Sequence, residues 1–269
     1  MSFMFQEYST LAERYAAAAA AGFQFVETAN PYTESPETLA ALLDKYNLSQ
    51  ALIDAPTGEE GEYGLACLPG RETDFQMSLE KAIVYAKALK CPRVHVMAGL
   101  VPKDALLVKA EETYEQNIRY AAERFANEGI TLLIEPVSDV LPGYFLFSVE
   151  QALGIIQKLD EVNLKLLLDL FHVQKVGHDA LGSISKAYKH IGHIQIAQSP
   201  FTYAHSSHIQ IAQSPERGDP STAGDIDYTA VFKLLQEEGF DGIVGLEYCC
   251  DKETGANVAA WLPKFGLAL

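Results

Sequence analysis

Carboxylates end three of the most apolar runs in this chain. Glu135 closes Thr131-Leu-Leu-Ile-Glu135, Asp169 closes Leu164-Lys-Leu-Leu-Leu-Asp169, and Glu247 closes Ile243-Val-Gly-Leu-Glu247. Such a run is typical of a buried parallel strand, where an acid is unusual because an uncompensated carboxylate is costly to bury. We therefore expect the three acids to share a metal site or an acid/base site at one end of a parallel sheet.

The chemistry that these acids favour is proton transfer beside a divalent cation. Glu135, Asp169 and Glu247, with an amide or imidazole from another strand, form an oxygen-rich set that suits Mg²⁺ or Mn²⁺. A cation that holds two adjacent substrate oxygens stabilises an enediolate, and two glutamates on opposite faces can act as acid and base. This combination is suited to moving a proton between neighbouring carbons.

Three further side chains are candidates for substrate contacts. His95 lies in Arg93-Val-His95-Val, His172 follows Asp169 by three residues, and Arg217 lies in Pro215-Glu-Arg217-Gly. A core histidine and a surface arginine are the structural alternatives for His95 and Arg217. We assign both histidines to substrate contacts, and Arg217 to a substrate carboxylate, since guanidinium groups pair with carboxylates in a bidentate way.

Strand-like and helical segments alternate along the chain. The expected strands are Phe23–Thr28, Ala51–Ala55, Arg93–Ala98, Thr131–Glu135, Leu164–Asp169, His193–Ala197 and Ile243–Glu247. The expected helices are Ser9–Ala21, Pro36–Tyr46, Glu72–Lys90, Ala105–Asn127, Val149–Leu159, Ser183–His190 and Tyr228–Glu238. Strict alternation predicts parallel strands with right-handed crossovers.

An α/β fold of the (β/α)8 TIM-type barrel is the architecture that this alternation favours at 269 residues. A doubly wound open sheet is the alternative, but no Gly-x-Gly-x-x-Gly follows any expected strand. We expect one barrel domain over residues 1–269. Its first strand is apparently missing, because only seven strands are visible and the chain opens almost directly into a helix.

One strand segment is duplicated. His193-Ile-Gln-Ile-Ala-Gln-Ser-Pro200 recurs unchanged as His208-Ile-Gln-Ile-Ala-Gln-Ser-Pro215, and 208 − 193 = 15 residues separate the copies. A single repeat does not indicate a solenoid, and only one copy can fill the strand position. Gln195 and Gln210 therefore compete for one ligand position, and we favour Gln195 because insertions are best tolerated in loops after strands.

The composition limits the function classes. Lys plus Arg total 20 against 36 Asp plus Glu, and a formal charge of −16 argues against general nucleic-acid binding and against an anionic membrane surface. Four irregularly placed cysteines are typical of reduced thiols in a cytoplasmic protein. The alanine run 16–21 is too short to cross a bilayer.

Together these residues resemble the hydroxypyruvate isomerase family, one of the xylose-isomerase-like barrels. The resemblance covers nearly the whole chain and is carried by these motifs: Val94-His-Val-Met-Ala-Gly99, Leu133-Ile-Glu-Pro136, Leu168-Asp-Leu-Phe-His172, Gly192-His-Ile-Gln-Ile-Ala-Gln198, Arg217-Gly-Asp-Pro220 and Gly245-Leu-Glu-Tyr248. Asn30-Pro-Tyr32 and Pro69-Gly-Arg71 are similar to family positions as well.

The resemblance implies roles for these residues. Glu135 and Glu247 would be the catalytic acid/base pair, and both would bind the metal with Asp169 and the glutamine of the His-Ile-Gln segment. His172 and Arg217 would contact a small hydroxy- or oxo-acid. The implied reaction interconverts hydroxypyruvate and 2-hydroxy-3-oxopropanoate (tartronate semialdehyde) through an enediol.

Several alternatives stay open from the sequence. They are an isomerase or 3-epimerase of another sugar acid or ketose, a non-catalytic isoform, and, as a distant possibility, a phosphodiester-cleaving enzyme. A homo-oligomer is left open.

Overall fold

A computed structural model describes residues 4–101, 106–192, 208–211, 221, 224–240, 242–248 and 260–267. Its strands follow in chain order: β1 (Phe25–Thr28), β2 (Ser49–Asp54), β3 (Arg93–His95), β4 (Thr131–Ile134), β5 (Leu164–Asp169), β6 (His208–Ile211) and β7 (Ile243–Leu246). The described strands form one sheet in the order β1-β2-β3-β4-β5-β6-β7, and every pair is parallel. The predicted parallel order is therefore confirmed.

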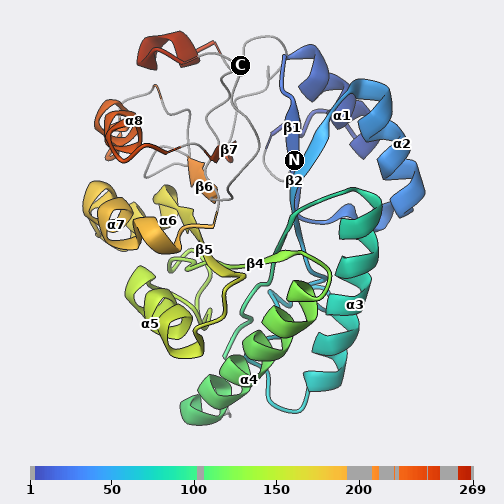
Figure 1. The fold of residues 1–269 in the computed structure, drawn as a ribbon, viewed down its shortest axis with the longest axis vertical. Coiled ribbons are helices and arrows are strands. Elements are labelled where there is room, and N and C mark those ends of the chain that lie inside the picture. The colour runs from blue at the N-terminus through green and yellow to red at the C-terminus, as the bar shows by residue number, and fades with distance from the viewer. Residues whose placement is uncertain are drawn as a thin grey trace.

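Helices connect these strands and lie around the outside of them (Figure 1). The α-helices are α1 (Leu11–Ala20), α2 (Pro36–Tyr46), α3 (Glu72–Ala88), α4 (Leu107–Ala126), α5 (Val149–Leu159), α6 (Leu170–Lys175), α7 (Ala180–Ala187) and α8 (Tyr228–Glu237). Short 3-10 helices cover Pro31–Thr33, Tyr188–His190 and Leu262–Phe265. Ser35 caps α2 by accepting from the Thr38 N–H, and Pro36 occupies the first helical position, as its fixed φ allows.

Three leucines mark the inward face of the sheet. Leu52, Leu133 and Leu167 come from β2, β4 and β5 and form a buried cluster separate from the main core. A separate small cluster is expected inside a barrel, because inward side chains pack in layers while outward ones pack against the helices. Residues two positions further along each strand also face inward, since side chains alternate along a strand.

Most predicted element boundaries agree with the structure to within two residues, and the errors at β3 and α7 are larger. Strand β3 ends at His95 rather than Ala98, because the chain turns away from the sheet and Gly64 pairs with Ala98 in an isolated bridge. Gly64 has φ +110°, and a side chain there would lie within 2.1 Å of the Met97 carbonyl oxygen, so only glycine permits this approach. Helix α7 begins at Ala180 rather than Ser183, because Asp179 caps it.

The second copy of the repeat forms the sixth strand. Leu166 pairs with Ile191 in an isolated parallel bridge, and the next residue of β5, Leu167, pairs with His208. The chain thus reaches the sixth strand position at Ile191 and continues there with His208. The predicted strand His193–Ala197 lies outside the described residues, and the preference for the first copy is not supported by this register.

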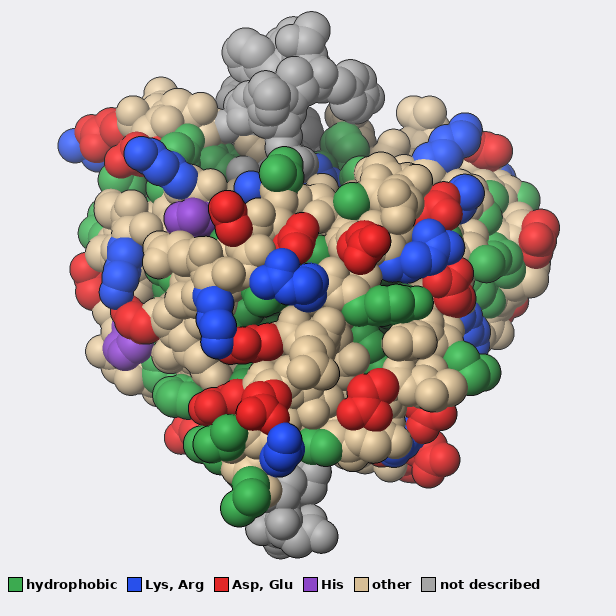
Figure 2. All heavy atoms as spheres, turned by 60° about the horizontal axis from the view of Figure 1, so that its bottom comes forward, with side chains coloured by type: hydrophobic (Ala, Val, Ile, Leu, Met, Phe, Trp, Pro, Cys, Tyr) green, Lys and Arg blue, Asp and Glu red, His purple; other side chains and the backbone are tan. Residues whose placement is uncertain are grey.

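Charged side chains of both signs cover the face shown in Figure 2, where Lys and Arg lie singly among Asp and Glu. Several of them form ion pairs between neighbouring helices. Arg124 of α4 bonds Glu80 of α3, and Lys158 of α5 bonds Glu115 of α4. Such exposed pairs contribute little each. Within the described residues, no helix is long and apolar enough to cross a membrane.

Candidate active site

The strand ends repeat one pattern, an inward leucine followed two residues later by an acid. The pairs are Leu52 and Asp54 on β2, Leu133 and Glu135 on and after β4, and Leu167 and Asp169 on β5. Because these strands are parallel and side chains alternate, the acids lie one level above the leucine cluster. This is the carboxyl end of the sheet, where active sites of α/β barrels lie.

Asp169 has two structural roles at once. It is the last residue of β5 and the N-cap of α6, where its Oδ1 accepts from the Phe171 N–H at 2.9 Å. Helix α6 was not predicted, since its six residues are too few to show a helical period. His172 lies three residues later in α6, and its side chain faces Asp169, with 3.6 Å between His172 Nε2 and Asp169 Oδ2.

His172 is fixed from its other side by the loop that follows β4. The backbone N–H of Ser138 donates to Nδ1 of His172 at 3.2 Å, and the Ser138 hydroxyl lies 2.8 Å from the same nitrogen. A backbone N–H can only donate, so Nδ1 is an acceptor and carries no proton. In the neutral ring the proton is therefore on Nε2, which faces Asp169.

Glu135, Asp169 and His172 converge closely enough to hold a metal ion. One ligand atom from each lies within 4.8 Å of the others, and all three residues are buried. The two carboxylates suit a hard divalent cation, which would also compensate their burial. His172 fits less well as a ligand, because Nδ1 is taken by Ser138 and Nε2 bears a proton that a metal bond would displace.

His95 lies between two acids. Its Nδ1 is 3.2 Å from Asp54 Oδ1, and its Nε2 is 3.8 Å from Glu135 Oε2, beyond hydrogen-bond reach. The ring is 3% exposed, and Nε2 has no hydrogen-bond partner among the described residues. His95 is thus neither a free surface residue nor a fully satisfied core histidine.

Two tyrosine hydroxyls make hydrogen bonds to the backbone near Asp54 and His95. Tyr32 donates its hydroxyl to the Asp54 carbonyl at 2.6 Å, and its ring packs edge-on against Tyr85. Burial, with Asp54 nearby, raises the pKa of Tyr32, so its phenol stays protonated and keeps donating. Tyr144, whose pKa is raised by burial, accepts from the Ala98 N–H just beyond His95. These bonds fix the turns after β2 and β3.

A buried arginine lies deeper on the same inward row as His95. Arg93, two residues before His95 on β3, donates from one guanidinium nitrogen to the Ala51 carbonyl at 3.2 Å. Burial lowers the pKa of Arg93 to about 10, against the opposing effect of Cys91 and Glu27. It remains charged at neutral pH, so a cation lies near the amino end of the strands, opposite the acids.

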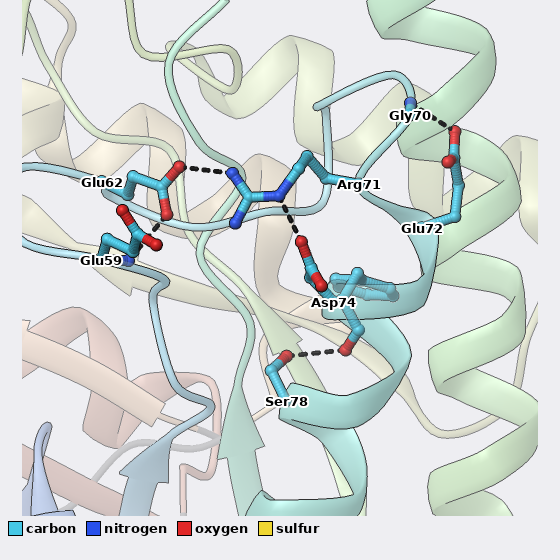
Figure 3. A network of polar contacts seen from close by, with 8 residues as sticks. Glu59, Glu62, Gly70, Arg71, Glu72, Asp74 and Ser78 are labelled. Carbon is cyan, nitrogen blue, oxygen red and sulfur yellow. Dashed lines mark hydrogen bonds and ion pairs between the residues drawn. The ribbon is translucent and has the colours of Figure 1, made fainter.

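Arg71, one of the family-like positions, is tied into its own loop (Figure 3). Its guanidinium pairs with Glu62 at 2.7 Å and with Asp74, and both raise the pKa of Arg71. Glu62 in turn accepts from the Glu59 N–H at 2.6 Å. These pairs tie the loop between β2 and α3 to the start of α3. The Arg71 guanidinium is therefore already paired with two carboxylates of the protein.

The structure describes Glu247 fully and Gln210 by its backbone. Glu247 directly follows β7 and is half-buried. Gln210 is in β6, where its Cα is the register partner of Asp169 and of Gly245, two residues before Glu247. Gln195 and Arg217 lie outside the described residues. The structure thus brings together Glu135, Asp169, His172 and His95.

Sequence reasoning missed Asp54 and Ser138. Asp54 could have been found, because Ala51-Leu-Ile-Asp54 is another apolar run that ends in an acid. Ser138 could not, because one of its bonds to His172 comes from a backbone N–H that every residue except proline has, and the hydroxyl that makes the other is common in loops.

The chain belongs to the xylose isomerase-like TIM barrel family, whose model matches residues 15–265. Among curated relatives it is 41% identical over 256 residues to a putative hydroxypyruvate isomerase of Mus musculus, with 92% of this chain and 87% of that protein covered. It is 38% identical over 268 residues to a 2-oxo-tetronate isomerase of Cupriavidus necator, with 98% and 96% covered.

A solved structure shares this fold over nearly its whole length. It is an AP endonuclease, family 2, from Brucella melitensis, with a TM-score of 0.86, 34% identity, and coverage of 97% of this chain and 95% of that one. The expected barrel family is therefore confirmed.

Proposed function

We propose that this chain is an isomerase that interconverts hydroxypyruvate and 2-hydroxy-3-oxopropanoate. The observation that carries the proposal is the group of buried acids at the carboxyl ends of β4 and β5, with His172 over them. The relatives named as hydroxypyruvate and 2-oxo-tetronate isomerases support the same reaction type.

In this proposal Glu135 and Glu247 transfer the proton. One carboxylate removes a proton from C3 of hydroxypyruvate, which gives an enediolate across C2 and C3. The second carboxyl group returns a proton to C2, while the oxygen on C2 gains a proton and the oxygen on C3 loses one. The product is an aldehyde at C3 and a hydroxyl at C2, with the carboxylate unchanged, so atoms and charge balance. Strands β4 and β7 are separated by two others, which favours opposite faces of the substrate.

Glu135, Asp169, Glu247 and a strand glutamine would hold a divalent cation, Mg²⁺ or Mn²⁺. When bound, such a cation supplies charge stabilisation for the enediolate oxygens. The register favours Gln210 over Gln195 for the glutamine, because Gln210 is the neighbour of Asp169. His172 is assigned to the substrate rather than to the metal, because its Nδ1 accepts from the Ser138 N–H and its Nε2 carries the proton.

Arg217 is the proposed partner of the substrate carboxylate. It follows Gln210 by 217 − 210 = 7 residues, a loop length typical of the βα loops that carry barrel active sites. His95 and His172 would contact the remaining substrate oxygens. We propose a small hydroxy- or oxo-acid as the only partner, without nucleic acid or membrane, in the cytoplasm.

The test is turnover of hydroxypyruvate by the purified chain with Mg²⁺ or Mn²⁺ added, followed by proton exchange at C3 in deuterated water. Loss of turnover in both Glu135→Gln and Glu247→Gln supports the assigned roles. Full activity in both variants would falsify the mechanism. A sharp thermal transition in each variant is the control for folding and also argues against a non-catalytic, misfolded chain.

A four-carbon 2-oxo sugar acid is the second candidate substrate. The similarity to a 2-oxo-tetronate isomerase, over nearly the whole of both chains, favours it. The same carbonyl and hydroxyl are present there with one more carbon beyond them. A ratio of kcat/KM values above about 10 for either acid would assign the substrate, because each factor of ten corresponds to about 1.4 kcal/mol of transition-state binding.

A further inference from the structure

The two histidines of the site are held through the same ring nitrogen, Nδ1, by partners of opposite kind. Nδ1 of His95 faces the carboxylate of Asp54 at 3.2 Å. Nδ1 of His172 faces the backbone N–H of Ser138 at 3.2 Å. A carboxylate accepts and a backbone N–H donates, so the two rings are required to place their protons differently.

Asp54 draws the proton of His95 to Nδ1. In the neutral ring Nε2 then carries only a lone pair and is a hydrogen-bond acceptor. This atom is buried and has no hydrogen-bond partner among the described residues. A buried polar atom without a partner is rare in folded proteins and indicates a missing ligand or water. The neighbour it approaches is Glu135, whose carboxylate oxygen is 3.8 Å away.

Ser138 has the reverse effect on His172. Its N–H occupies the lone pair of Nδ1, so Nε2 bears the proton and is a donor. The Ser138 hydroxyl, 2.8 Å from Nδ1, also donates to it. Nε2 lies 3.6 Å from Asp169 Oδ2, on the side where Glu135 and Asp169 converge.

We propose that Asp54 and Ser138 are positioning residues that hold His95 and His172 in opposite tautomers. The site thereby presents one imidazole acceptor and one imidazole donor on either side of Glu135 and Asp169. This pattern fits a hydroxyl group beside a carbonyl group on adjacent carbons. The hydroxyl donates to His95 and the carbonyl accepts from His172.

The ligand class is therefore a 2-oxo acid that carries a hydroxyl on C3. This part rests on the proposed function, whereas the two tautomers rest on geometry alone. A 2-oxo acid without that hydroxyl leaves Nε2 of His95 buried without a partner, and we expect it to bind more weakly. Sites that hydrogen-bond a substrate hydroxyl strongly reject the analogue that lacks it.

The experiment that tests the tautomers is ¹⁵N NMR of the full chain labelled at histidine, at about pH 8.5, where an unperturbed imidazole is neutral. Protonated and unprotonated ring nitrogens have well separated ¹⁵N shifts. The signals of the two rings are assigned by their loss in His95→Asn and His172→Asn, out of 7 histidines. The expected result is a proton on Nδ1 of His95 and on Nε2 of His172.

Two matched variants separate a side-chain effect from a backbone effect. In Asp54→Asn the amide can donate to Nδ1, so the proton of His95 moves to Nε2. In Ser138→Ala the backbone N–H remains, so the proton of His172 stays on Nε2. Ring signals that show the same tautomer for both histidines, a doubly protonated His95, or an unchanged His95 in Asp54→Asn would each overturn the inference.

Kinetics then connect the tautomer to the reaction. We expect Asp54→Asn to lower kcat on the order of 10²–10⁴-fold, because the same change in a serine-protease triad costs about 10⁴-fold through the wrong tautomer. KM rises as well, since the proton on Nε2 in the variant removes the acceptor for the substrate hydroxyl. A kcat within about threefold of the original overturns the positioning role. Hydroxypyruvate that is not turned over at all, with both tautomers as stated, defeats the proposed function and leaves the tautomers standing.

Discussion

The strand ends of β2–β5 and those of β6–β7 are constructed differently. At β2–β5, Asp54, Glu135 and Asp169 follow inward leucines, and two histidines are tied to named partners within 3.2 Å. At β7, Glu247 is only half-buried, and β6 consists of the first four residues of the second repeat copy. The strand ends of β2–β5 thus form a buried, interconnected group, whereas the described strand ends of β6–β7 add backbone register and one half-buried acid. Each prediction below tests that difference.

The largest expected effect is on catalysis by the two glutamates. Glu135→Gln and Glu247→Gln should each lower kcat by about 10²–10⁴-fold, the range for loss of a general acid or base. Their stabilities should differ. Glu135 is 8% exposed and lies close to Asp169, so the substitution at this buried position should change Tm by about 2–4 °C, equal to about 1 kcal/mol.

Glu247→Gln is the matched control for this stability effect. Because Glu247 is half-buried, the same substitution should leave Tm of the metal-free chain nearly unchanged. Differential scanning calorimetry with and without Mg²⁺ measures both. Equal shifts in the two variants would contradict the distinction between the two regions.

The next effect separates the two copies of the repeat. Gln210→Ala should lower kcat/KM by at least about 10–100-fold, the cost of losing a residue that only supports a metal ligand, whereas Gln195→Ala should change it less than threefold. The substitutions are identical and are made in identical octapeptides, so each is the control for the other. Metal titration of both variants shows whether the loss is in cation affinity. The opposite ranking would place the first copy in the sheet.

A third effect concerns alkaline pH and the β2–β3 side of the molecule. Burial raises the pKa of Cys67 and of Cys91 to about 12 from a usual 9.0. The folded pKa is the higher one, so this stability is complete below pH 9 and is lost as pH rises toward 12. We expect the free energy of unfolding to fall by up to about 1.4 kcal/mol per pH unit for each thiol.

Urea unfolding between pH 8 and 11 measures this slope. Cys91→Ala removes one thiol, so the slope of unfolding free energy against pH should decrease by up to about 1.4 kcal/mol per pH unit, the contribution of one proton. The cavity left by the substitution lowers stability equally at every pH. A slope that is unchanged in the variant would show that Cys91 does not titrate on unfolding.

The smallest effect is expected in the loop of Figure 3. Arg71→Ala breaks its part-buried pair with Glu62 and its exposed pair with Asp74, and such pairs near the surface are individually weak. Tm should fall by about 2 °C or less in low salt and by less still in 1 M salt, because screening weakens such pairs. A drop above about 6 °C would mean that this loop supports the β2–β5 region more than its exposure suggests.

Much of the fold, and the buried acids of the candidate site, were predictable from residue patterns. Apolar runs such as Leu164–Asp169 identify buried strands because parallel strands are apolar on both faces. Glu135 and Asp169 were found for the same reason, since an acid is conspicuous there. Asp54 also ends an apolar run, but that run has only three residues, Ala51-Leu-Ile, and is a weaker signal.

Other features could not be read from patterns. Helix α6 has six residues, fewer than two turns, and starts directly from β5. Ser138 contributes a backbone N–H, which leaves no trace in residue type, and a hydroxyl whose partner His172 lies 34 residues further along the chain. The sheet position of the repeat could not be read either, because identical octapeptides have identical propensity and hydropathy. Only the pairing of β5 with His208 separates them.

That identity has a thermodynamic consequence. Exchanging one octapeptide for the other in the sixth strand position changes no side-chain contact within the sheet, so the two arrangements are degenerate in packing energy. Their free-energy difference comes from the connections, with 15 extra residues either before the strand or after it. Loop-closure entropy depends only weakly on length, about 0.6 kcal/mol per doubling. Packing within the sheet therefore does not choose between the copies, and the observed pairing of β5 with His208 puts the 15 extra residues before the strand and Arg217 7 residues beyond Gln210.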